Sequence, residues 1–574
     1  MKKEPISPVQ RFWMLLKPDA KEIRNIYIYS IFSGLISLSL PLGIQSIANL
    51  IQGGQVNTSW IILTVFVVLG IVFVGVLQIF QLRITENLQQ KIFTRAAFDF
   101  SYRIPHIKME ALYKHYAPEL MNRFFDIASV QKGLSKILID FSAAFFVVVF
   151  SLILLSFYHF FFIIFSVFLL ILIYVIFKTT AKKGLETSLL ESKYKYKVAH
   201  WLEELSRTAV TFKLARRSSL PLEKTDKYVK SYLSARESHF KVLITQYYLM
   251  IIFKIFVATS LLVMGGILVM NQQMNIGQFI AAEIIILTIM ASVEKLILSV
   301  ESIYDILTSL EKIGQVTDLE LDRTSGVKLK IEQEEGGLEI EIEDISFTYP
   351  EDKKLALENI SFTVNKGELM VITGESSSGK STLLHIISGL YQTQQGSICY
   401  NKLPIGNISL NSIREQIGGH ITMERLFEGT LLENITLGRK MATFENAKWA
   451  VENLELNDFI KKLPEGYNTM LNAQGRGLPE SIVTKLLLAR GIVTKPKLLL
   501  LENTFEQLDE ESCIRIIDFI TNKKNGWTIV AVSSNKYLAK LANNIVVLAT
   551  GKILHIGTYD KLKDIVKFKL KGNA

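Results

Sequence analysis

The chain has 574 residues, enough for several domains, and 49% of them are hydrophobic. Its net charge of +10 does not indicate nucleic-acid binding, because the basic excess lies between apolar segments, as in cytoplasmic membrane loops. The only cysteines, Cys399 and Cys513, lack paired spacing, which argues against a disulfide framework and fits a reducing cytosol.

The first 24 residues are too polar and too interrupted for a cleavable signal peptide, and we expect them to form a cytoplasmic N-terminus. Six apolar segments follow. Each is about 20 residues long, the length that spans the hydrocarbon core of a bilayer at 1.5 Å per residue. The predicted spans are residues 26–50, 59–82, 138–157, 160–178, 243–270 and 277–300.

The connections between these spans alternate between short and long, and their charges differ. The short ones contain no Lys or Arg, whereas residues 83–137 contain nine and residues 178–242 contain fifteen. By the positive-inside rule, both long connections and both termini lie in the cytoplasm.

Both long connections have Glu, Lys, Leu and Ala at helical spacing, for example in RITENLQQKIFTRAAF. We therefore expect the membrane helices to continue below the bilayer. The ends of these extensions are either a solvated cytoplasmic face or a pair of reverse turns that press on the soluble half, and we favour the turns.

Ionisable residues inside the predicted spans are costly and usually face a cavity or a partner. Lys254 and Glu294 lie sixteen and seventeen residues from the last short loop, hence at similar depth. We predict that they form an ion pair, which leaves Glu283 to line a cavity in the outer half. Alternatively, Lys254 and Glu294 are interfacial and snorkel to water.

A polar linker at 318–337 precedes the strand-like alternation GLEIEIEDISFTY. The segment ELMVITGESSSGKSTLLHIISGL then reads as an apolar strand, a glycine-rich turn and an apolar helix, and it fits the phosphate-loop pattern G-x-x-x-x-G-K-[ST]. Backbone N–H groups of such a turn converge on phosphates, Lys380 reaches the outer phosphates, and the Ser381 hydroxyl can hold Mg²⁺. The alternative is a vestigial phosphate loop.

Six spans with two long cytoplasmic extensions, followed by this phosphate-loop domain, resemble a half-transporter of the ATP-binding cassette (ABC) exporters. The spacing around LPLGIQSIANLIQGG and ELMNRFFDIASVQKGLS is most similar to bacteriocin and type I secretion exporters, without their peptidase domain. The resemblance implies a membrane all-α domain of six helices at 25–317 and a cytoplasmic α/β phosphate-loop NTPase domain at 338–574.

The resemblance also implies ATP and Mg²⁺ as cofactors and assigns residues to them. Tyr349 matches the aromatic residue that stacks on adenine, and GESSSGKST matches the phosphate loop. The implied metal-holding residues are Ser381 and Glu502. The implied ATP-binding residues are Tyr349, Gly374, Glu375, Ser376, Ser377, Ser378, Gly379, Lys380, Ser381 and Thr382.

Several catalytic positions of the family are altered in this sequence. The glutamine that senses magnesium and water is Thr422, and the switch histidine is Ser534. In LLLLENTFEQLD the magnesium-coordinating Asp is Glu502, and the general-base Glu is Asn503. The signature LSGGQ reads LPESI, namely Leu478, Pro479, Glu480, Ser481 and Ile482.

These changes predict a domain that binds ATP and hydrolyses it slowly or not at all. Asn503 can orient a water but cannot accept its proton, and general-base catalysis is worth about 10²- to 10⁴-fold. In the family, the signature of one chain faces the γ-phosphate of the nucleotide bound to the other chain of a dimer. The carboxylate of Glu480 would repel that phosphate, at a cost on the order of 4 kcal/mol for one pair of like charges at about 4 Å and an effective dielectric near 20. Alternatively, Pro479 at the first helical position and Glu480 beside the dipole simply start a helix well.

The family works as dimers in which a phosphate loop and the partner's signature enclose each nucleotide. We expect a homodimer or a heterodimer with another half-transporter. The resemblance implies that the dimer lies in the lipid bilayer of a bacterial inner membrane and that a periplasmic adaptor is a further partner. We expect no nucleic-acid partner. The implied substrate is a peptide or protein. The alternatives are an ATP-binding membrane scaffold or sensor, and an active ATPase with Glu502 or Glu506 as a displaced base.

Overall fold

The computed structural model describes residues 6–53, 58–215, 217–329 and 336–565, which form two compact units. Unit 1 comprises Met1–Pro105 and His115–Leu319, and unit 2 comprises His106–Lys114 and Glu320–Ala574. Residues 54–57 of the first short loop, residues 330–335 of the linker and both chain ends lie outside the described residues.

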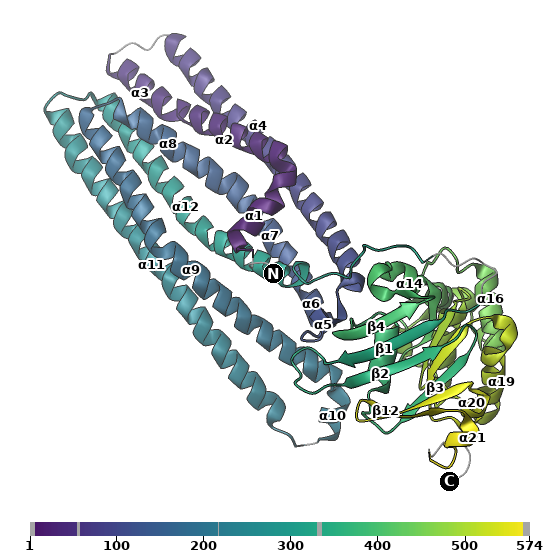
Figure 1. Ribbon diagram of the computed structural model, residues 1–574. Helices are drawn as coiled ribbons and strands as arrows, with labels where there is room; N and C mark the ends of the chain where they lie inside the picture. Colours follow the sequence, from purple (N-terminus) through teal and green to yellow (C-terminus); the bar gives the residue numbers. More distant parts are fainter. Residues whose placement is uncertain (1–5, 54–57, 216, 330–335, 566–574) are drawn as a thin grey trace. The chain divides into compact units, whose positions relative to one another are not determined.

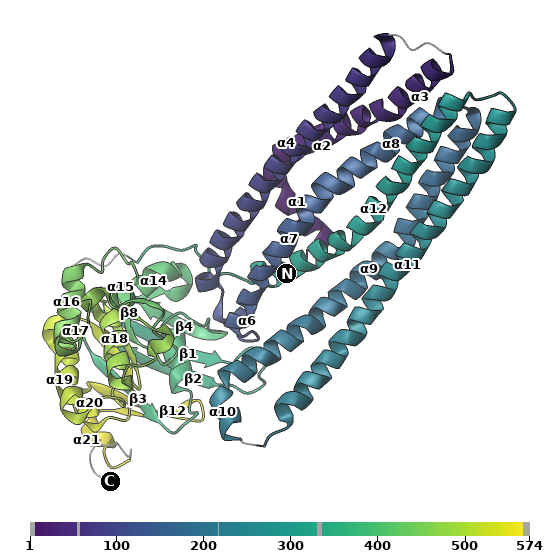
Figure 2. The same ribbon diagram turned by 180° about the vertical axis from the view of Figure 1, so that it is seen from behind.

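Unit 1 is helical (Figures 1 and 2). Within the described residues, six helical stretches are long and apolar enough to cross a membrane, which confirms the predicted six-span membrane domain. Its helices are α1 (Pro8–Leu16), α2 (Ala20–Ser37), α3 (Ser39–Gln52), α4 (Thr58–Arg103), α6 (Ala117–Met121), α7 (Asp126–Ser135), α8 (Ser142–Ser156), α9 (Phe160–Arg207), α10 (Ala209–Leu214), α11 (Leu220–Met270) and α12 (Ile276–Thr317).

The longest helices extend well past the length of their apolar segments. Helices α9 and α11 have 48 and 51 residues, which at 1.5 Å per residue is roughly 70 Å, more than twice the thickness of a hydrocarbon core. The two run side by side in both views (Figures 1 and 2). The prediction that membrane helices continue beyond the bilayer is confirmed by these lengths.

The first predicted span, residues 26–50, is not one continuous helix. Helix α2 ends at Ser37 and α3 begins at Ser39. Pro41 explains the interruption, because it has no N–H to donate to the carbonyl of Ser37 four residues earlier. Hydropathy alone does not predict this interruption, because the segments on both sides of it are apolar.

Helix α12 is the central element of unit 1. It packs against α3, α7, α8, α9 and α11, and one buried cluster joins it to α8, α9 and α11 through side chains such as Phe162, Phe253 and Ile289. Burial of these aromatic and aliphatic groups is the main favourable contribution to packing among helices.

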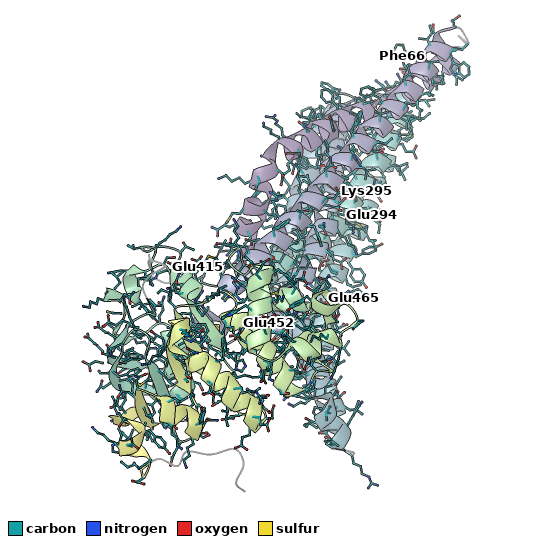
Figure 3. All side chains as sticks on the ribbon, turned by 90° about the vertical axis from the view of Figure 1, so that its right-hand side faces the viewer. Phe66, Glu294, Lys295, Glu415, Glu452 and Glu465 are labelled. Carbon is teal, nitrogen blue, oxygen red and sulfur yellow. The ribbon has the colours of Figure 1, made fainter. Side chains whose placement is uncertain are left out.

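The predicted pair between Lys254 of α11 and Glu294 of α12 is present. The Nζ atom of Lys254 lies 2.7 Å from Oε2 of Glu294, as their equal distance from the intervening turn predicts. Both side chains are about one-third exposed. Figure 3 labels Glu294 beside Lys295 on α12. Glu283 lies nearer the start of the same helix and is exposed, so its role as a cavity-lining group stays a prediction.

Unit 2 contains two main sheets, which confirms the predicted α/β cassette. The antiparallel sheet has the order β2-β1-β4-β5, and the six-stranded sheet has the order β12-β11-β3-β10-β9-β6 and is parallel except at β12. The strands are β1 (Ile340–Phe347), β2 (Leu357–Val364), β3 (Leu369–Gly374), β4 (Gln395–Tyr400), β5 (Leu403–Pro404), β6 (Ile417–His420), β7 (Gly429–Thr430), β8 (Met470–Leu471), β9 (Leu498–Glu502), β10 (Thr528–Val532), β11 (Asn544–Ala549) and β12 (Lys552–Gly557).

The helices of unit 2 flank the sheets (Figures 1 and 2). They are α5 (Met109–Leu112), α13 (Lys380–Ile387), α14 (Leu410–Gln416), α15 (Leu431–Thr436), α16 (Phe444–Asn453), α17 (Asn457–Lys461), α18 (Glu480–Ile492), α19 (Glu510–Thr521), α20 (Lys536–Leu541) and α21 (Tyr559–Leu562). Helix α5 lies in the first long connection between spans, yet belongs to the same compact unit as the cassette.

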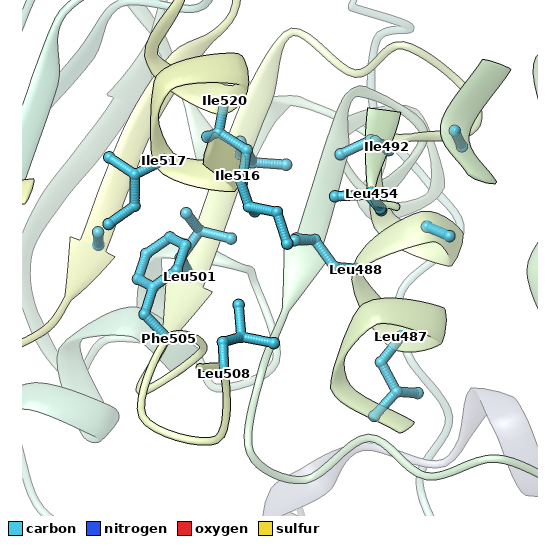
Figure 4. Close-up of a cluster of buried hydrophobic side chains, with 14 of the residues drawn as sticks. Leu454, Leu487, Leu488, Ile492, Leu501, Phe505, Leu508, Ile516, Ile517 and Ile520 are labelled. Carbon is cyan, nitrogen blue, oxygen red and sulfur yellow. The ribbon is translucent and has the colours of Figure 1, made fainter. Parts of the chain in front are cut away.

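The leucine run before Glu502 forms the buried strand β9. Successive side chains of a strand point to opposite faces, and Leu498 and Leu500 belong to one buried cluster while Leu499 and Leu501 belong to the other. Figure 4 shows the second cluster, where Leu501 lies among side chains of α18 and α19. Because both faces of β9 are core, the fold requires this strand whatever residue follows it.

Candidate nucleotide-binding site

The phosphate-loop segment forms the predicted strand, turn and helix. Strand β3 leads into residues 374–379, and α13 begins at Lys380. Two glycines are required by the geometry. Gly374 and Gly379 have φ of 142° and 97°, and a Cβ at either position would lie within 2.7 Å of a backbone carbonyl, so only glycine fits without strain.

Lys380 is folded back over this turn. Its ammonium donates to the carbonyl oxygens of Gly374 at 3.0 Å and Glu375 at 2.5 Å, and lies 3.3 Å from the Ser378 hydroxyl. Burial lowers the pKa of Lys380. The Lys380 ammonium thus lies at the start of α13, where its positive charge, the free N–H groups and the helix dipole all favour the binding of an anion.

A cavity of about 480 Å³ opens beside this turn. Tyr349 lines it together with residues 376–382, so the structure brings the predicted adenine-stacking residue and most of the phosphate loop to one site. The Tyr349 hydroxyl lies 3.0 Å from Oγ1 of Thr382. Gly374 and Glu375 take part through their carbonyl groups to Lys380 rather than as lining residues.

Glu502 ends strand β9 next to the helix start and is 3% exposed. Its carboxylate accepts hydrogen bonds from the side chain of Ser381 and from the backbone N–H of Thr422, the latter at 2.9 Å. Burial opposes ionisation of Glu502, but these hydrogen bonds outweigh it and its pKa lies below the usual range. The side-chain oxygen atoms of Ser381 and Glu502, both of a type that can bind a metal ion, therefore lie close together.

None of the other altered positions carries a carboxylate. Asn503 directly follows Glu502 and is exposed, and its backbone N–H donates to the carbonyl oxygen of Val532 at 3.0 Å. Thr422 is exposed and donates its backbone N–H to Glu502, and Ser534 is half-buried and follows strand β10 in the chain. None of these three residues lines the cavity, and their roles in catalysis stay predictions.

The degenerate signature lies elsewhere in unit 2. Glu480 is the first residue of α18 and is exposed, while Leu478 and Ile482 pack against the core. Pro479 is the N-cap residue and not the first helical residue, so that detail of the sequence-based prediction is wrong by one position. Residues 478–482 do not line the cavity, consistent with a motif whose family role is toward a partner.

Two histidines near Glu502, the buried His385 and the half-buried His420, were not predicted from the sequence. Nε2 of His385, on α13, lies 3.9 Å from Glu502, and neither ring nitrogen has a hydrogen-bond partner within the described residues. His420, at the end of β6, shares a hydrogen bond of 3.1 Å with Thr504, and burial lowers its pKa to about 4. An ionisable residue within an otherwise apolar run was the signal available for both.

Comparison with known proteins identifies both units. The family profile "ABC transporter transmembrane region" matches residues 23–293, and the profile "ABC transporter" matches residues 357–506. Among solved structures, a bacterial Atm1-family ABC exporter with ATP bound is similar, with a TM-score of 0.81 and 15% identity over 96% of this chain and 97% of that one. At this identity the likeness concerns the fold.

Curated relatives share more sequence over a shorter region. The alpha-hemolysin translocation ATP-binding protein HlyB of Escherichia coli is 29% identical over 299 residues, which is 52% of this chain and 42% of the relative. The uncharacterized ABC transporter ATP-binding protein YfiB of Bacillus subtilis is 31% identical over 258 residues, 44% of this chain and 43% of the relative.

The leukotoxin translocation ATP-binding protein LktB of Mannheimia glucosida is 28% identical over 299 residues, 52% of this chain and 42% of the relative. The chain spans about half the length of the curated relatives it matches. The multi-pass helical domain and the nucleotide-binding unit each match a profile of this family, and the chain belongs to the ABC transporters.

Proposed function

We propose that this exporter subunit binds ATP with Mg²⁺, hydrolyses it slowly or not at all, and moves a peptide or protein outward as part of a dimer. The membrane domain would span 25–317 and the cassette 338–574. The observation that carries the proposal is the contrast at the end of β9. The phosphate loop lines a cavity and the Ser381 hydroxyl is hydrogen-bonded to Glu502, whereas Asn503 supplies no carboxylate to the reacting water.

The residues present fit a magnesium ion. Mg²⁺ prefers oxygen donors, and the Ser381 hydroxyl and the Glu502 carboxylate are within hydrogen-bonding reach of each other. When bound, the ion would neutralise charge on the outer phosphates. Lys380 would bind the same phosphates, and Tyr349 would orient the adenine by stacking.

The chemistry missing from the site is proton abstraction. An amide at Asn503 can hold a water by hydrogen bonds but has no basic oxygen of suitable pKa. Ser534 is too short to supply an imidazole-like contact to the γ-phosphate. Glu502 already accepts hydrogen bonds from Ser381 and Thr422, so its use as a displaced base would require it to leave both partners.

The partner and the location rest on the family and on charge. Both signature and catalytic positions are altered in this one chain, so a homodimer would contain two poorly equipped sites and a heterodimer none that is complete. Export of a peptide or protein is supported by the names of HlyB and LktB, which describe the translocation of alpha-hemolysin and of leukotoxin. The basic long connections support cytoplasmic termini. The bacterial inner membrane and a periplasmic adaptor are proposed from the likeness to these bacterial relatives.

ATP binding by the full-length protein in nanodiscs tests the first half of the proposal. Lys380→Ala removes a charge-assisted contact to phosphate, so we expect at least about a tenfold loss of ATP affinity. Lys448→Ala is the matched control, because Lys448 is exposed on α16 and forms an ion pair with Glu452 on the same helix. Equal affinity in Lys380→Ala and the unmodified protein would contradict nucleotide binding at this site.

Purification of the tagged chain from its native membrane tests the dimer. A second half-transporter with an intact LSGGQ and Asp-Glu pair would establish a heterodimer, and the chain alone in twofold stoichiometry would establish a homodimer. ATP-dependent accumulation of a co-purified peptide in inverted vesicles would separate transport from the alternative role of an ATP-binding scaffold.

A further inference from the structure

The ring of Tyr349 is stacked by a second tyrosine that lies far from it in the sequence. The centroids of Tyr113 and Tyr349 are 5.3 Å apart and their planes differ by 18°. This is the separation at which aromatic pairs attract each other beyond simple burial. Tyr113 follows helix α5 in the first long connection, within the part of that connection that belongs to unit 2.

Tyr349 has two further aromatic neighbours. The rings of Phe347 and Tyr391 lie 5.1 Å and 5.4 Å away and are nearly perpendicular to it. Its hydroxyl lies 3.0 Å from Thr382 of the phosphate-loop helix. Several contacts therefore fix the orientation of the Tyr349 ring, and among the described residues Tyr113 is the only aromatic residue that stacks on Tyr349.

Tyr113 does not occupy the nucleotide cavity. The cavity is lined by Tyr349, Asp352 and Thr382 but not by Tyr113. Tyr349 is therefore accessible from the cavity while its ring is stacked on Tyr113. Adenine that enters from the cavity would meet a Tyr349 ring whose orientation Tyr113 helps to fix.

The segment around Tyr113 is fastened to the turn that carries Tyr349. Lys114 forms an ion pair with Glu351, and the Tyr113 hydroxyl donates to Asp352 at 3.4 Å. On the other side of α5, Glu110 accepts a hydrogen bond of 2.7 Å from the backbone N–H of Gln392. These contacts place Tyr113 against the 349–352 turn specifically, and not against the cassette surface in general.

We propose that Tyr113 is a positioning residue for the adenine base, which it orients by stacking on Tyr349. The proposal rests on the proposed function, because it assumes that Tyr349 receives adenine. Loss of one aromatic stacking contact changes an equilibrium by about two- to tenfold. The effect should concern the base alone, since the phosphates are held by the separate contacts of Lys380 and the loop.

The test uses the full-length protein in nanodiscs and two ligands, ATP and inorganic tripolyphosphate, with affinities measured by calorimetry. We expect Tyr113→Ala to weaken ATP about two- to tenfold and to leave tripolyphosphate unchanged. Tyr113→Phe keeps the ring and should bind ATP within twofold of the unmodified protein. Tyr116→Ala is the control, because Tyr116 is 44% exposed and its ring contacts Arg207 instead.

Each other outcome counts against the proposal in its own way. Unchanged ATP affinity in Tyr113→Ala would show that Tyr349 needs no support, and tighter ATP binding would show that Tyr113 competes with adenine. Equal loss of ATP and tripolyphosphate would show a merely structural role. If the unmodified protein bound tripolyphosphate but not ATP, the adenine role of Tyr349 would fail, and if it bound neither, the proposed function itself would fail.

Discussion

Asn503 follows strand β9 with a φ of 49°, in the left-handed region where Asn is several-fold enriched. Asn503 therefore suits the backbone of a tight turn, and under the proposed function the same residue would stand where a general base is needed. A glutamate at this position would supply the base but would lack the local advantage of Asn. This makes the position a direct test of whether the missing carboxylate limits the chemistry.

We expect Asn503→Glu to raise the rate of phosphate release by at least about tenfold. The full 10²- to 10⁴-fold value of a general base should not be reached, because Thr422 and Ser534 remain unsuited to hydrolysis. Asn503→Gln is the control, since it changes length without adding a base. A rate for Asn503→Glu equal to that of Asn503→Gln, measured with saturating ATP, would contradict the account at this residue.

His420 makes the stability of unit 2 depend on pH. Burial lowers its pKa to about 4 in the folded protein, below the value of about 6.5 in an unfolded chain. The unfolded state therefore binds the proton more readily. The stabilisation is fully present above about pH 6.5 and is lost as the pH falls toward 4, by at most about 3 kcal/mol.

Thermal unfolding of the detergent-solubilised protein at pH 7.5 and pH 5.0 measures this loss. We expect a clearly lower Tm at pH 5.0, and a smaller difference in His420→Gln, which cannot take up the proton. His115→Gln changes an exposed histidine and serves as the control. An undiminished pH effect in His420→Gln would assign it to other groups.

At the scale of elements, hydropathy and charge predicted the membrane helices and a phosphate-loop cassette, but not every helix boundary. The length of the apolar segments identified the spans, because about 20 consecutive apolar residues are needed to cross the hydrocarbon core of a bilayer. It could not show the break at Ser37 that Pro41 imposes, since the residues on both sides are equally apolar. Counting residues from a turn did predict the contact between Lys254 and Glu294, because rise per residue is constant along a helix.

The Lys254–Glu294 pair links α11 to α12 and can be tested as a unit. Lys254→Met and Glu294→Gln each leave one ionisable group without its partner, so each should lower the Tm in nanodiscs. The double variant should be more stable than the two single effects predict, with a coupling energy of about 0.6–1.7 kcal/mol. Lys295→Met is the control on the same helix (Figure 3). Simple additivity of the two changes would mean that the pair contributes nothing.

The candidate site was predictable to the extent that its residues are close in sequence. The phosphate loop is one continuous segment, and its glycines follow from the φ values and close approaches of the turn. His385, His420 and Tyr113 were missed because their proximity to Glu502 or Tyr349 is produced by the sheet order and by the grouping of α5 with the cassette. Such neighbours are set by tertiary structure, and no short pattern in the chain encodes them.

At the scale of the whole molecule, the proposed exporter subunit binds ATP but hydrolyses it slowly or not at all. Strand β9 is buried on both faces, so the cassette fold is retained independently of catalysis. Under the proposed function, the changed residues in its turn and in the signature would slow or abolish hydrolysis without removing the cavity. Transport by a dimer containing this chain would depend on ATP occupancy, and any fast hydrolysis would have to come from groups on a partner.

The steady-state ATPase rate of the full-length protein in nanodiscs, measured beside its ATP affinity, tests the central claim most directly. Enzymes commonly turn over at about 10 s⁻¹, and loss of a general base lowers this by about 10²- to 10⁴-fold. The account predicts ATP binding that is lost in Lys380→Ala, with turnover on the order of 10⁻¹ to 10⁻³ s⁻¹ or slower. Turnover of several per second that disappears in Lys380→Ala would contradict it.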